Sequence, residues 1–350
     1  MRVLVVNVGS SSIKGSVVES RDGAAFAQAE MSLGTDATKR QRFEKTVGGL
    51  LNKLKVDGQI EVVGHRVVHG GTRFTKAVRI NAQVLRGIEE LATFAPLHNP
   101  MAARGIRATQ AALPRVPQVA CFDTAFHATL TQEQYLYPVP WGWHREYGVR
   151  RFGFHGLSVE WSMGRAAELL DRPVEDLALI VAHLGSGCSV TSVMGGRSVA
   201  TSMGLTPMEG LMMGTRSGSI DPGILLYMLR TRRASWRELE KALDHDSGLV
   251  GVSGRRIGMK ELEEAAGKRN QRAQLAIDMF VSRTAAGIAA VATALPRVDA
   301  LIFTGGIGEH SELTRKRVQE QLATVRIDKV LTIEAREDAV VARQVEALLR

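Results

Sequence analysis

Two short segments that lie half a chain apart share one strand–turn–strand pattern. Residues 5–10 read VVNVGS and residues 181–186 read VAHLGS, so that apolar, polar, glycine and serine positions coincide at an offset of 176 residues. The alternating residues 13–18 then lie over residues 189–194. A repeat at this distance predicts a duplicated domain with a binding site between the two copies.

The second copy opens a glycine-rich stretch. An apolar strand ends just before Gly185, Ser186 and Gly187, which form a tight turn. Without a Cβ at the two glycines, backbone N–H groups can approach an anion closely, and the serine hydroxyl can add a hydrogen bond. The pattern therefore predicts a phosphate cradle, with an ordinary hairpin turn as the alternative. It is not a P-loop, because no Gly-Lys-Ser/Thr follows and the next element has a strand pattern.

A third glycine turn, residues 305–308, ends the apolar run at residues 301–304 and opens a helix pattern. The N–H groups at the start of a helix can receive a phosphate. The other helix patterns are at residues 42–55, 105–113, 161–171, 224–243 and 259–294. Residues 135–154 are rich in aromatic side chains and are expected to form a packed connection or a subunit contact.

Composition limits the class of protein. A chain of 350 residues is long enough for two domains with separate cores. No apolar run approaches the roughly 18 residues of a membrane span, and residues 3–8 are too short for a signal-peptide core, so we expect a cytoplasmic protein without membrane contact. Cys121 and Cys188 lie in apolar, strand-like runs, which favours reduced and buried thiols.

The formal net charge is +9, which suits either nucleic acid or small anions as partners. The 45 Lys and Arg residues are spread along the whole chain, aromatic residues make up only 5%, and no helix-turn-helix, zinc or RNP pattern occurs. We therefore expect small anionic substrates and no nucleic acid. Solubility alone is the simpler explanation for most of these charges.

Polar residues at strand ends provide candidate site residues. Arg66 stands inside an apolar strand, and a buried arginine needs an anionic partner, so it is a candidate fork for a carboxylate or phosphate. Asp123 closes another apolar strand, where active sites collect in α/β sheets, although a helix N-cap is the alternative. Asn7 could reach a phosphate or a metal-bound water. Pro207 lies near Arg216, which suggests a small apolar pocket beside a cation.

The chain resembles the acetate kinase family of the acetate and sugar kinase, Hsc70 and actin superfamily. The matching strings are NVGSSSIKGSVVE, GHRVVHGG, APLHNP, CFDTAFH, YGVRRFGFHG, AHLGSGCSV, GLTPMEGLMMGTRSGSIDPG and FTGGIGEHS, in family order over nearly the whole chain. The resemblance implies an α/β protein with duplicated ribonuclease H-like (actin-like ATPase) domains that face a central cleft. The first lobe would comprise residues 1–124 and 338–350, and the second, with the nucleotide site, residues 125–337.

The resemblance also implies an activity, cofactors and partners. The family transfers a phosphoryl group reversibly from ATP to acetate or propionate and forms an acyl phosphate and ADP. ATP would be the co-substrate, with Mg²⁺ or Mn²⁺ as the metal. A homodimer is expected, with the helix pattern around residues 279–295 as a candidate interface.

Family roles are carried over onto matching positions. Arg66 and Arg216 match the pair that binds the carboxylate and the transferring phosphoryl group, His155 the transition-state stabiliser, and Asp123 the acid that orients the acyl substrate or metal. The acyl pocket corresponds to Val68, Leu97, Phe154 and Pro207. The magnesium-associated positions are Asn7 and Glu337, with Asp338 as the neighbouring alternative. The phosphate and nucleotide contacts are Ser10, Ser12, Lys14, His183, Gly185, Ser186, Gly187, Gly306, Gly308 and His310.

The chain departs from the family pattern around the nucleotide. Asparagine usually stands in the family where this chain has Ser186 and His310, and aspartate where it has Ser219. The chain is also shorter than the family norm, before Arg66 and before Glu337. Two alternatives therefore stay open: another donor, such as a different nucleotide or pyrophosphate, and a nucleotide-binding relative without catalysis.

Overall fold

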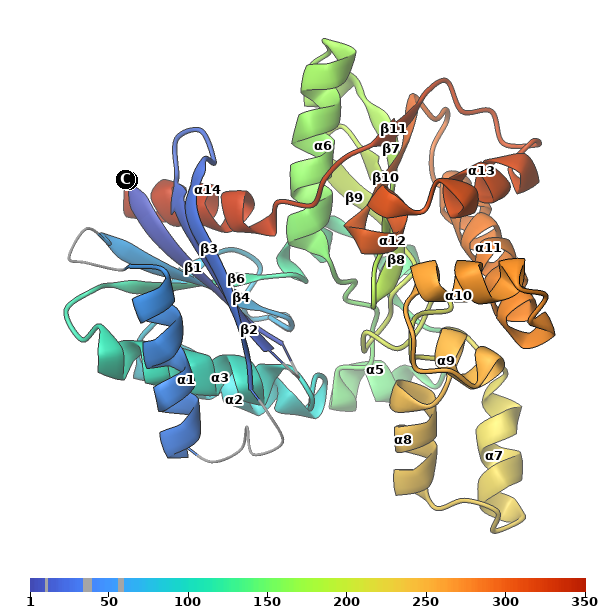
Figure 1. Cartoon of the computed structure of the whole chain (residues 1–350), viewed down its shortest axis with the longest axis horizontal. Coiled ribbons are helices and arrows are strands. Elements are labelled where there is room, and N and C mark those ends of the chain that lie inside the picture. Colours follow the sequence, from blue (N-terminus) through green and yellow to red (C-terminus); the bar gives the residue numbers. More distant parts are fainter. Residues whose placement is uncertain (10–11, 34–39, 56–59) are drawn as a thin grey trace. The chain divides into compact units, whose positions relative to one another are not determined.

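The computed structural model describes residues 1–9, 12–33, 40–55 and 60–350, and the chain divides into two compact units (Figure 1). Unit 1 comprises Met1–Ala128, Phe154–Trp161 and Arg336–Arg350, and unit 2 comprises Thr129–Gly153 and Ser162–Ala335. The contacts thus group residues 154–161 with unit 1, whereas the sequence placed them in the second lobe. The exact extent of the lobes stays a prediction.

Unit 1 is built on a six-stranded sheet with the order β3-β2-β1-β4-β6-β5. Its strands are β1 (Arg2–Val8), β2 (Ser12–Glu19), β3 (Ala25–Ser32), β4 (Val62–Val67), β5 (Val78–Arg79) and β6 (Gln118–Phe122). β1, β4 and β6 are parallel, while β2, β3 and β5 pair antiparallel with their neighbours. The helices of this unit are α1 (Arg40–Lys53), α2 (Ala82–Glu90), α3 (Asn99–Ala112) and α14 (Glu337–Leu349). Helix α6 (Gly156–Leu170) begins in unit 1 and ends in unit 2.

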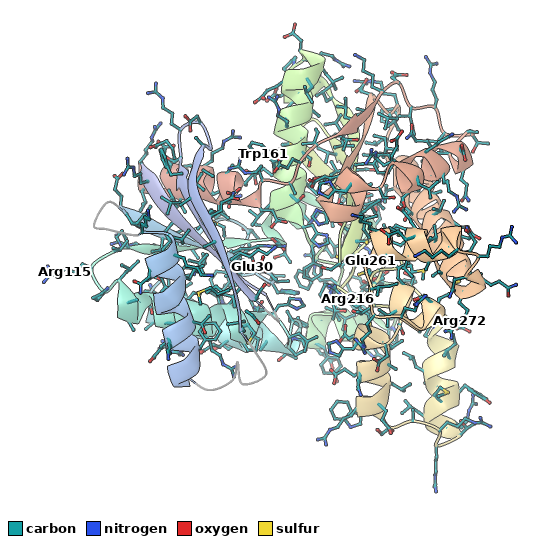
Figure 2. The ribbon with its side chains drawn as sticks, in the orientation of Figure 1. Glu30, Arg115, Trp161, Arg216, Glu261 and Arg272 are labelled. Carbon is teal, nitrogen blue, oxygen red and sulfur yellow. The ribbon has the colours of Figure 1, made fainter. Side chains whose placement is uncertain are left out.

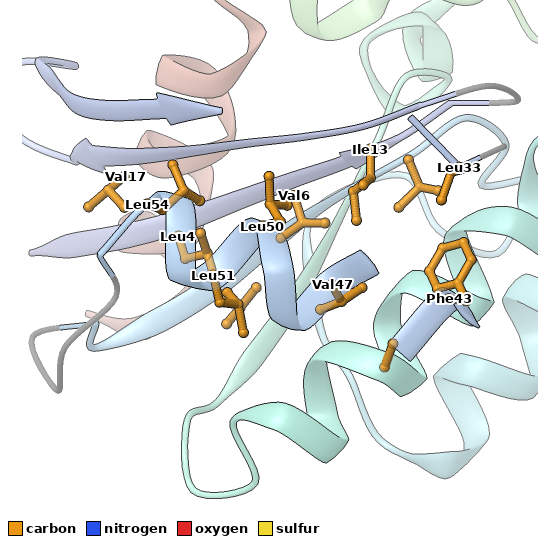
Figure 3. Packing of buried hydrophobic residues seen from close by; sticks show 13 residues of the cluster. Leu4, Val6, Ile13, Val17, Leu33, Phe43, Val47, Leu50, Leu51 and Leu54 are labelled. Carbon is orange, nitrogen blue, oxygen red and sulfur yellow. The ribbon is translucent and has the colours of Figure 1, made fainter. Parts of the chain in front are cut away.

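The central strand β1 is buried on both faces of its sheet. Successive side chains point to opposite faces, so Leu4 and Val6 pack with α1 on one side (Figure 3), and Val3 and Val5 pack with α14 on the other. Burial of each such side chain stabilises the fold by roughly 1.5–3 kcal/mol. Gly64 on β4 allows α14 to approach, because a Cβ there would lie 2.5 Å from a Val341 methyl group. The C-terminal helix is therefore fixed against the N-terminal sheet.

Unit 2 repeats this arrangement in a five-stranded sheet with the order β11-β10-β7-β8-β9. Its strands are β7 (Ala178–Leu184), β8 (Cys188–Met194), β9 (Arg197–Thr201), β10 (Ala300–Thr304) and β11 (Val330–Thr332). β7, β8 and β9 form an antiparallel meander, and β10 and β11 continue the sheet in parallel with β7. β7, β8, β9, β10 and β11 thus correspond to β1, β2, β3, β4 and β6, as expected for a duplicated domain.

The two copies differ by one residue after the turn. Val8 pairs with Ile13, with four residues between them in the chain, whereas only three residues separate the paired Leu184 and Cys188. Ile13 therefore corresponds to Cys188. The overlay of the two segments predicted Ser189 instead, and that prediction is wrong. Because side chains alternate between faces, a shift of one residue places every side chain of the second strand on the opposite face of the sheet.

The predicted helices are present with shifted ends. The pattern at residues 224–243 forms two helices, α7 (Pro222–Arg230) and α8 (Trp236–His245), because Ser235 and Glu238 form a capping box that starts a new helix. The pattern at residues 259–294 likewise splits into α10 (Met259–Gly267) and α11 (Gln271–Ala292). Residues 135–154, expected as a connection, contain the short helix α5 (Trp141–Tyr147). The remaining helices of unit 2 are α4 (Gln132–Tyr135), α9 (Gly248–Ser253), α12 (Gly305–His310) and α13 (Glu312–Gln321).

Within the part of the chain that the structure describes, α11 is the one helix long and apolar enough to cross a membrane. Asp278 and Arg283 interrupt its apolar residues, so it is not one continuous apolar run. The helix packs against β7, β8 and three other helices, and Ala276, Phe280 and Ile288 are among its buried residues. These contacts are those of the core helix that the spacing of its apolar residues predicts.

Candidate active site

A cluster of three charged side chains lies at one end of the sheet of unit 1. The Arg66 guanidinium donates from Nε to Asp123 Oδ1 at 3.0 Å and from Nη2 to Asp123 Oδ2 at 2.7 Å. Its Nη1 donates to Glu337 Oε2 at 2.8 Å. Asp123 is almost fully buried, whereas the side chains of Arg66 and Glu337 keep 16% and 19% of their surface exposed. The cluster therefore faces outward along one side.

The order of the strands brings these residues together. Arg66 is on β4, Asp123 directly follows β6, and Glu337 is the first residue of α14. Asn7 on β1 pairs with Arg66 in register, so the two side chains share the face that α14 covers. Arg66 and Asp123, predicted separately from their strands, therefore meet in one fork, and Asn7 lies beside it.

Charge holds the cluster in its ionised form. Burial by itself would lower the pKa of Arg66, but the carboxylates of Asp123 and Glu337 outweigh this effect and raise its pKa. Two of the five guanidinium N–H groups are not used in these three contacts. Those donors can still bind an anion.

Glu337 and Asp338 are adjacent in the sequence but bind different partners. Glu337 joins Arg66, whereas Asp338 accepts from Arg336 Nε at 2.8 Å and from the backbone N–H of Ala339 at 3.0 Å. Of the two carboxylates considered for the metal, Glu337 is the one that lies in the cluster with Arg66 and Asp123.

His155 is held in an unusual backbone conformation at the start of α6. Its φ is +59°, a left-handed value that costs a non-glycine residue roughly 1–2 kcal/mol. The N–H of Gly156 donates to the carbonyl of Asp123 at 3.0 Å, and a Cβ on Gly156 would lie 2.2 Å from that carbonyl oxygen. The residue after His155 must therefore be glycine, and this contact fixes His155 relative to the Asp123 backbone.

The buried side chain of His127 holds the residue that precedes His155. Its Nε2 lies 2.9 Å from the carbonyl oxygen of Phe154, and both side chains are buried. Burial lowers the pKa of His127 to about 4, so the ring is neutral at pH 7. In the neutral ring, Nε2–H is the donor to the Phe154 carbonyl. Sequence reasoning gave His127 no role, because its partner is 27 residues away.

Three of the four predicted acyl-pocket residues belong to unit 1. Phe154 is buried, Val68 is half-buried and Leu97 is 37% exposed. The His69 ring stacks on Phe94 and meets the Phe154 ring edge-on, with centroids 5.4 Å apart. Asn99 joins this group, because it accepts from the His69 N–H and donates to the His69 carbonyl. The fourth pocket residue, Pro207, is in unit 2.

Arg216 is a half-buried cation in unit 2 (Figure 2). Its Nη1 donates to the carbonyl of Pro207, so the predicted proximity of these two residues is confirmed. Among the described residues, no carboxylate lies within ion-pair distance of its guanidinium. Burial lowers the pKa of Arg216, and only the more distant charge of Asp244 and the Cys188 thiol oppose this effect. An anion would relieve the desolvated charge.

The glycine turn of unit 2 is tightly closed. The N–H of Gly185 donates to the carbonyl of Gly187 at 3.0 Å, and the Ser186 carbonyl accepts from Gly214 at 3.2 Å. A Cβ on Gly185 would lie 3.5 Å from Nε2 of His183 and 4.0 Å from the backbone nitrogen of Gly306. The turn after β7, the His183 ring and the start of α12 are therefore neighbours.

The other predicted phosphate residues belong to both units. Gly306 and His310 are exposed on α12, and Gly308 is buried against the end of β10. Ser12 starts β2, and Lys14 is exposed with its Nζ 3.8 Å from Glu30. Ser10 lies outside the described residues. Ser219, one of the departures from the family pattern, bonds to Gly210 through its backbone and its hydroxyl.

In the described ranges, no group of three or more His, Cys, Asp or Glu side chains is arranged to hold a metal ion. A cavity of about 730 Å³ is lined by Met1, Glu19, Arg21, Glu346 and Arg350. None of these five was predicted as a site residue.

The depressed pKa of His127 predicts a pH-dependent stability. In the unfolded chain the pKa is near its usual 6.5, so between pH 6.5 and about 4 the unfolded state binds more protons than the folded state. The contribution of His127 to the free energy of unfolding should therefore fall as the pH is lowered through this window, by up to about 1.4 kcal/mol per pH unit, and the buried His65, whose pKa is also lowered to about 4, adds a second contribution of the same sign. Urea unfolding at pH 7, 6 and 5 measures the slope.

The matched control replaces an exposed histidine. His127→Gln should reduce the slope by the contribution of this one ring while that of His65 remains, whereas His245→Gln should keep the slope of the wild type. Identical slopes for wild type and His127→Gln would show that His127 is not a buried neutral ring.

Comparison with known proteins identifies the family. The model of the Acetokinase family matches residues 2–347. The chain is 44% identical over 344 residues to an acetate kinase from Deinococcus radiodurans, across 93% of this chain and 86% of that protein. It is similar to the solved structures of a propionate kinase from Francisella tularensis (34% identity, TM-score 0.90, 98% of each chain) and an acetate kinase from Porphyromonas gingivalis (32%, 0.88, 100% of each chain). The predicted actin-like α/β class is thereby confirmed, and the chain belongs to the acetokinase family, whose members are phosphotransferases with a carboxyl group as acceptor.

Proposed function

We propose that this protein transfers the γ-phosphoryl group of ATP reversibly to acetate or propionate, forming an acyl phosphate and ADP. The observation that carries the proposal is the contrast between two arginines. Two carboxylates hold Arg66 and leave two of its N–H donors unused. Arg216 is desolvated and has no ion-pair partner among the described residues. Family membership and the names of the similar enzymes support the choice of substrates.

The proposed roles follow from the charge that develops during phosphoryl transfer. The transferring group carries negative charge on its oxygens, and the acceptor is itself an anion, so catalysis needs positioning and neutralisation. Arg66 and Arg216 supply the two cations. His155 adds a hydrogen-bond donor at a position that its strained backbone and Gly156 fix. Asp123 orients Arg66 through two of its N–H groups.

The residues near Arg66 fit a magnesium ion that is held mainly by a nucleotide. Mg²⁺ prefers oxygen ligands, usually retains several waters, and binds through one or two carboxylates together with substrate phosphates. Asn7 and Glu337 offer an amide and a carboxylate, and the lack of a larger cluster in the described residues agrees with this kind of site. The bound ion would neutralise charge on the phosphates. Mn²⁺ has similar ligand preferences and is a candidate substitute.

The nucleotide site is proposed for unit 2. The turn at residues 185–187, the His183 ring and the backbone at Gly306 are neighbours, and Gly306 leaves open space where a side chain would stand. Backbone N–H groups in such turns can bind phosphate oxygens. Ser186, Gly308 and His310 would complete the site in unit 2.

A donor panel tests this function. Purified protein with acetate, Mg²⁺ and ATP should form acyl phosphate, detected as the hydroxamate, and the same assay with other nucleotides and pyrophosphate identifies the preferred donor. Acyl phosphate from pyrophosphate alone would overturn the choice of donor. No acyl phosphate from any donor would leave a nucleotide-binding protein without this activity.

Removal of the unpaired cation should act on the chemical step. Arg216→Ala is expected to lower kcat by about 10²-fold or more while the Kd for MgATP changes little, because a single electrostatic donor in a transition state has that effect. Steady-state kinetics and calorimetric titration with nucleotide measure the two quantities. A loss of nucleotide binding that matches the loss of kcat would contradict the role.

Val68 tests the acyl pocket. Val68→Ala should shift preference towards longer acids, because a wall smaller by about two methyl groups can change discrimination by ~1–3 kcal/mol. The ratio of kcat/KM for acetate to that for butyrate reports the change. An unchanged ratio would remove Val68 from the pocket.

We also propose that the protein is a homodimer, and the structure suggests a surface other than the predicted helix at residues 279–295. Most apolar residues of α11 are buried within unit 2, whereas α7 has no buried residue. The exposed apolar side chains of α7 and α8 are Ile224, Leu226, Tyr227, Leu229 and Trp236. An exposed apolar group of this kind indicates an interaction surface.

Analytical ultracentrifugation distinguishes the possibilities. A dimer that Leu226→Arg converts to a monomer supports the α7 surface, because a desolvated charge would oppose association. A wild-type protein that sediments as a monomer at micromolar concentration would contradict the dimer.

A further inference from the structure

We propose that Tyr137 and Glu209 are positioning residues that hold the loop at residues 202–210 in the shape that presents Pro207 and Arg216. The inference rests on the proposed roles of Pro207 and Arg216, and it assigns a function to two residues that contact neither substrate in the proposed scheme. All of these residues belong to unit 2.

The Tyr137 hydroxyl links two points of this loop. It donates to Oε2 of Glu209 and accepts from the backbone N–H of Leu205 at 3.0 Å. Pro207 lies between these two contacts in the sequence. One hydroxyl group therefore fixes the chain on both sides of the proline.

Arg151 fixes the loop from the other side of the carboxylate. Its Nη2 donates to Oε1 of Glu209 at 2.8 Å, and its Nη1 donates to the carbonyls of Ser202 at 2.9 Å and Met203 at 3.0 Å. The guanidinium also lies over the Tyr137 ring, 5.4 Å from the centroid. Both oxygens of Glu209 are used, and the beginning and end of the loop are joined through one carboxylate.

The backbone makes room for this network at Gly204. A Cβ on Gly204 would lie 1.7 Å from Oε2 of Glu209 and 2.1 Å from the Tyr137 oxygen, so only glycine is compatible with the pair. The Gly204 carbonyl also accepts from the N–H of Phe152 at 3.0 Å. Segment 135–152 thus holds the loop through side-chain and backbone bonds.

The loop is bonded to the proposed catalytic arginine and also to Ser219, three residues after it. Arg216 donates to the Pro207 carbonyl, at the centre of the loop. At its end, Gly210 accepts from the Ser219 N–H at 2.9 Å and donates to the Ser219 hydroxyl at 3.1 Å. A displaced loop would therefore move the wall of the acyl pocket and the carbonyl that orients Arg216. Binding of the carboxylic acid should be affected, while nucleotide binding should not.

Tyr137→Phe is the sharpest test, because it removes one oxygen and keeps the ring. We expect KM for acetate to rise about 3- to 10-fold, the range that loss of one hydrogen bond gives, with KM for ATP unchanged. Tyr147→Phe in the same segment is the matched control, since Tyr147 is exposed, and it should behave as the wild type. Tyr137→Phe combined with Glu209→Gln should be less than additive, because both variants break the same bond.

Amide hydrogen exchange gives a readout that does not depend on activity. In Tyr137→Phe, the amides of residues 202–210 should exchange faster while those of α11 keep their protection. Faster loop exchange with a raised KM for acetate supports the positioning role. Unchanged loop exchange, or equal loss of protection in α11, would overturn it. A wild-type protein without acyl phosphate activity would instead reject the proposed function, and the exchange experiment would still decide whether Tyr137 holds the loop.

Discussion

The interaction on which unit 1 depends is the fork between Arg66 and two carboxylates. A charge that is largely removed from water must be paired, and removal of one partner from a buried pair typically costs about 3–5 kcal/mol. Asp123 and Glu337 provide that pairing from the end of β6 and from the start of α14. Close packing of α14 at Gly64 places the carboxylate of Glu337 where Arg66 can reach it. The packing of α14 on the N-terminal sheet therefore also determines the geometry of the charged cluster.

Arg216 presents the opposite arrangement. Its guanidinium is desolvated, its pKa is lowered, and its hydrogen bond goes to a neutral carbonyl. Internal carboxylates hold Arg66 rigidly, whereas Arg216 retains an unsatisfied charge that an anion can neutralise. A phosphotransferase benefits from both kinds of cation, because positioned charges stabilise the transition state without reorganisation during the reaction. We propose that the network of Tyr137, Arg151 and Glu209 positions Arg216, because it holds the loop whose Pro207 carbonyl accepts from the guanidinium.

The sequence was most informative where the chemistry is local. The repeated strand–turn–strand segments predicted a duplicated sheet, and the structure confirms the topology, but a turn shorter by one residue moved the second strand out of the predicted overlay. Arg66 and Asp123 were found separately as polar residues in apolar strands. Their pairing with each other was not predicted, because it depends on the order of strands in the sheet. Glu209 lies in one of the strings that match the family, but the sequence assigned it no role, since its partners are more than fifty residues away.

The central claim is that Arg66 and Arg216 act on the same transferring group. A crystal structure of the protein with MgADP, aluminium fluoride and acetate tests it most directly, because the fluoride complex occupies the place of the phosphoryl group. We expect both guanidinium groups to lie within hydrogen-bond distance of the analogue or of the acetate oxygens. A complex in which either guanidinium contacts neither the analogue nor the acetate would contradict it.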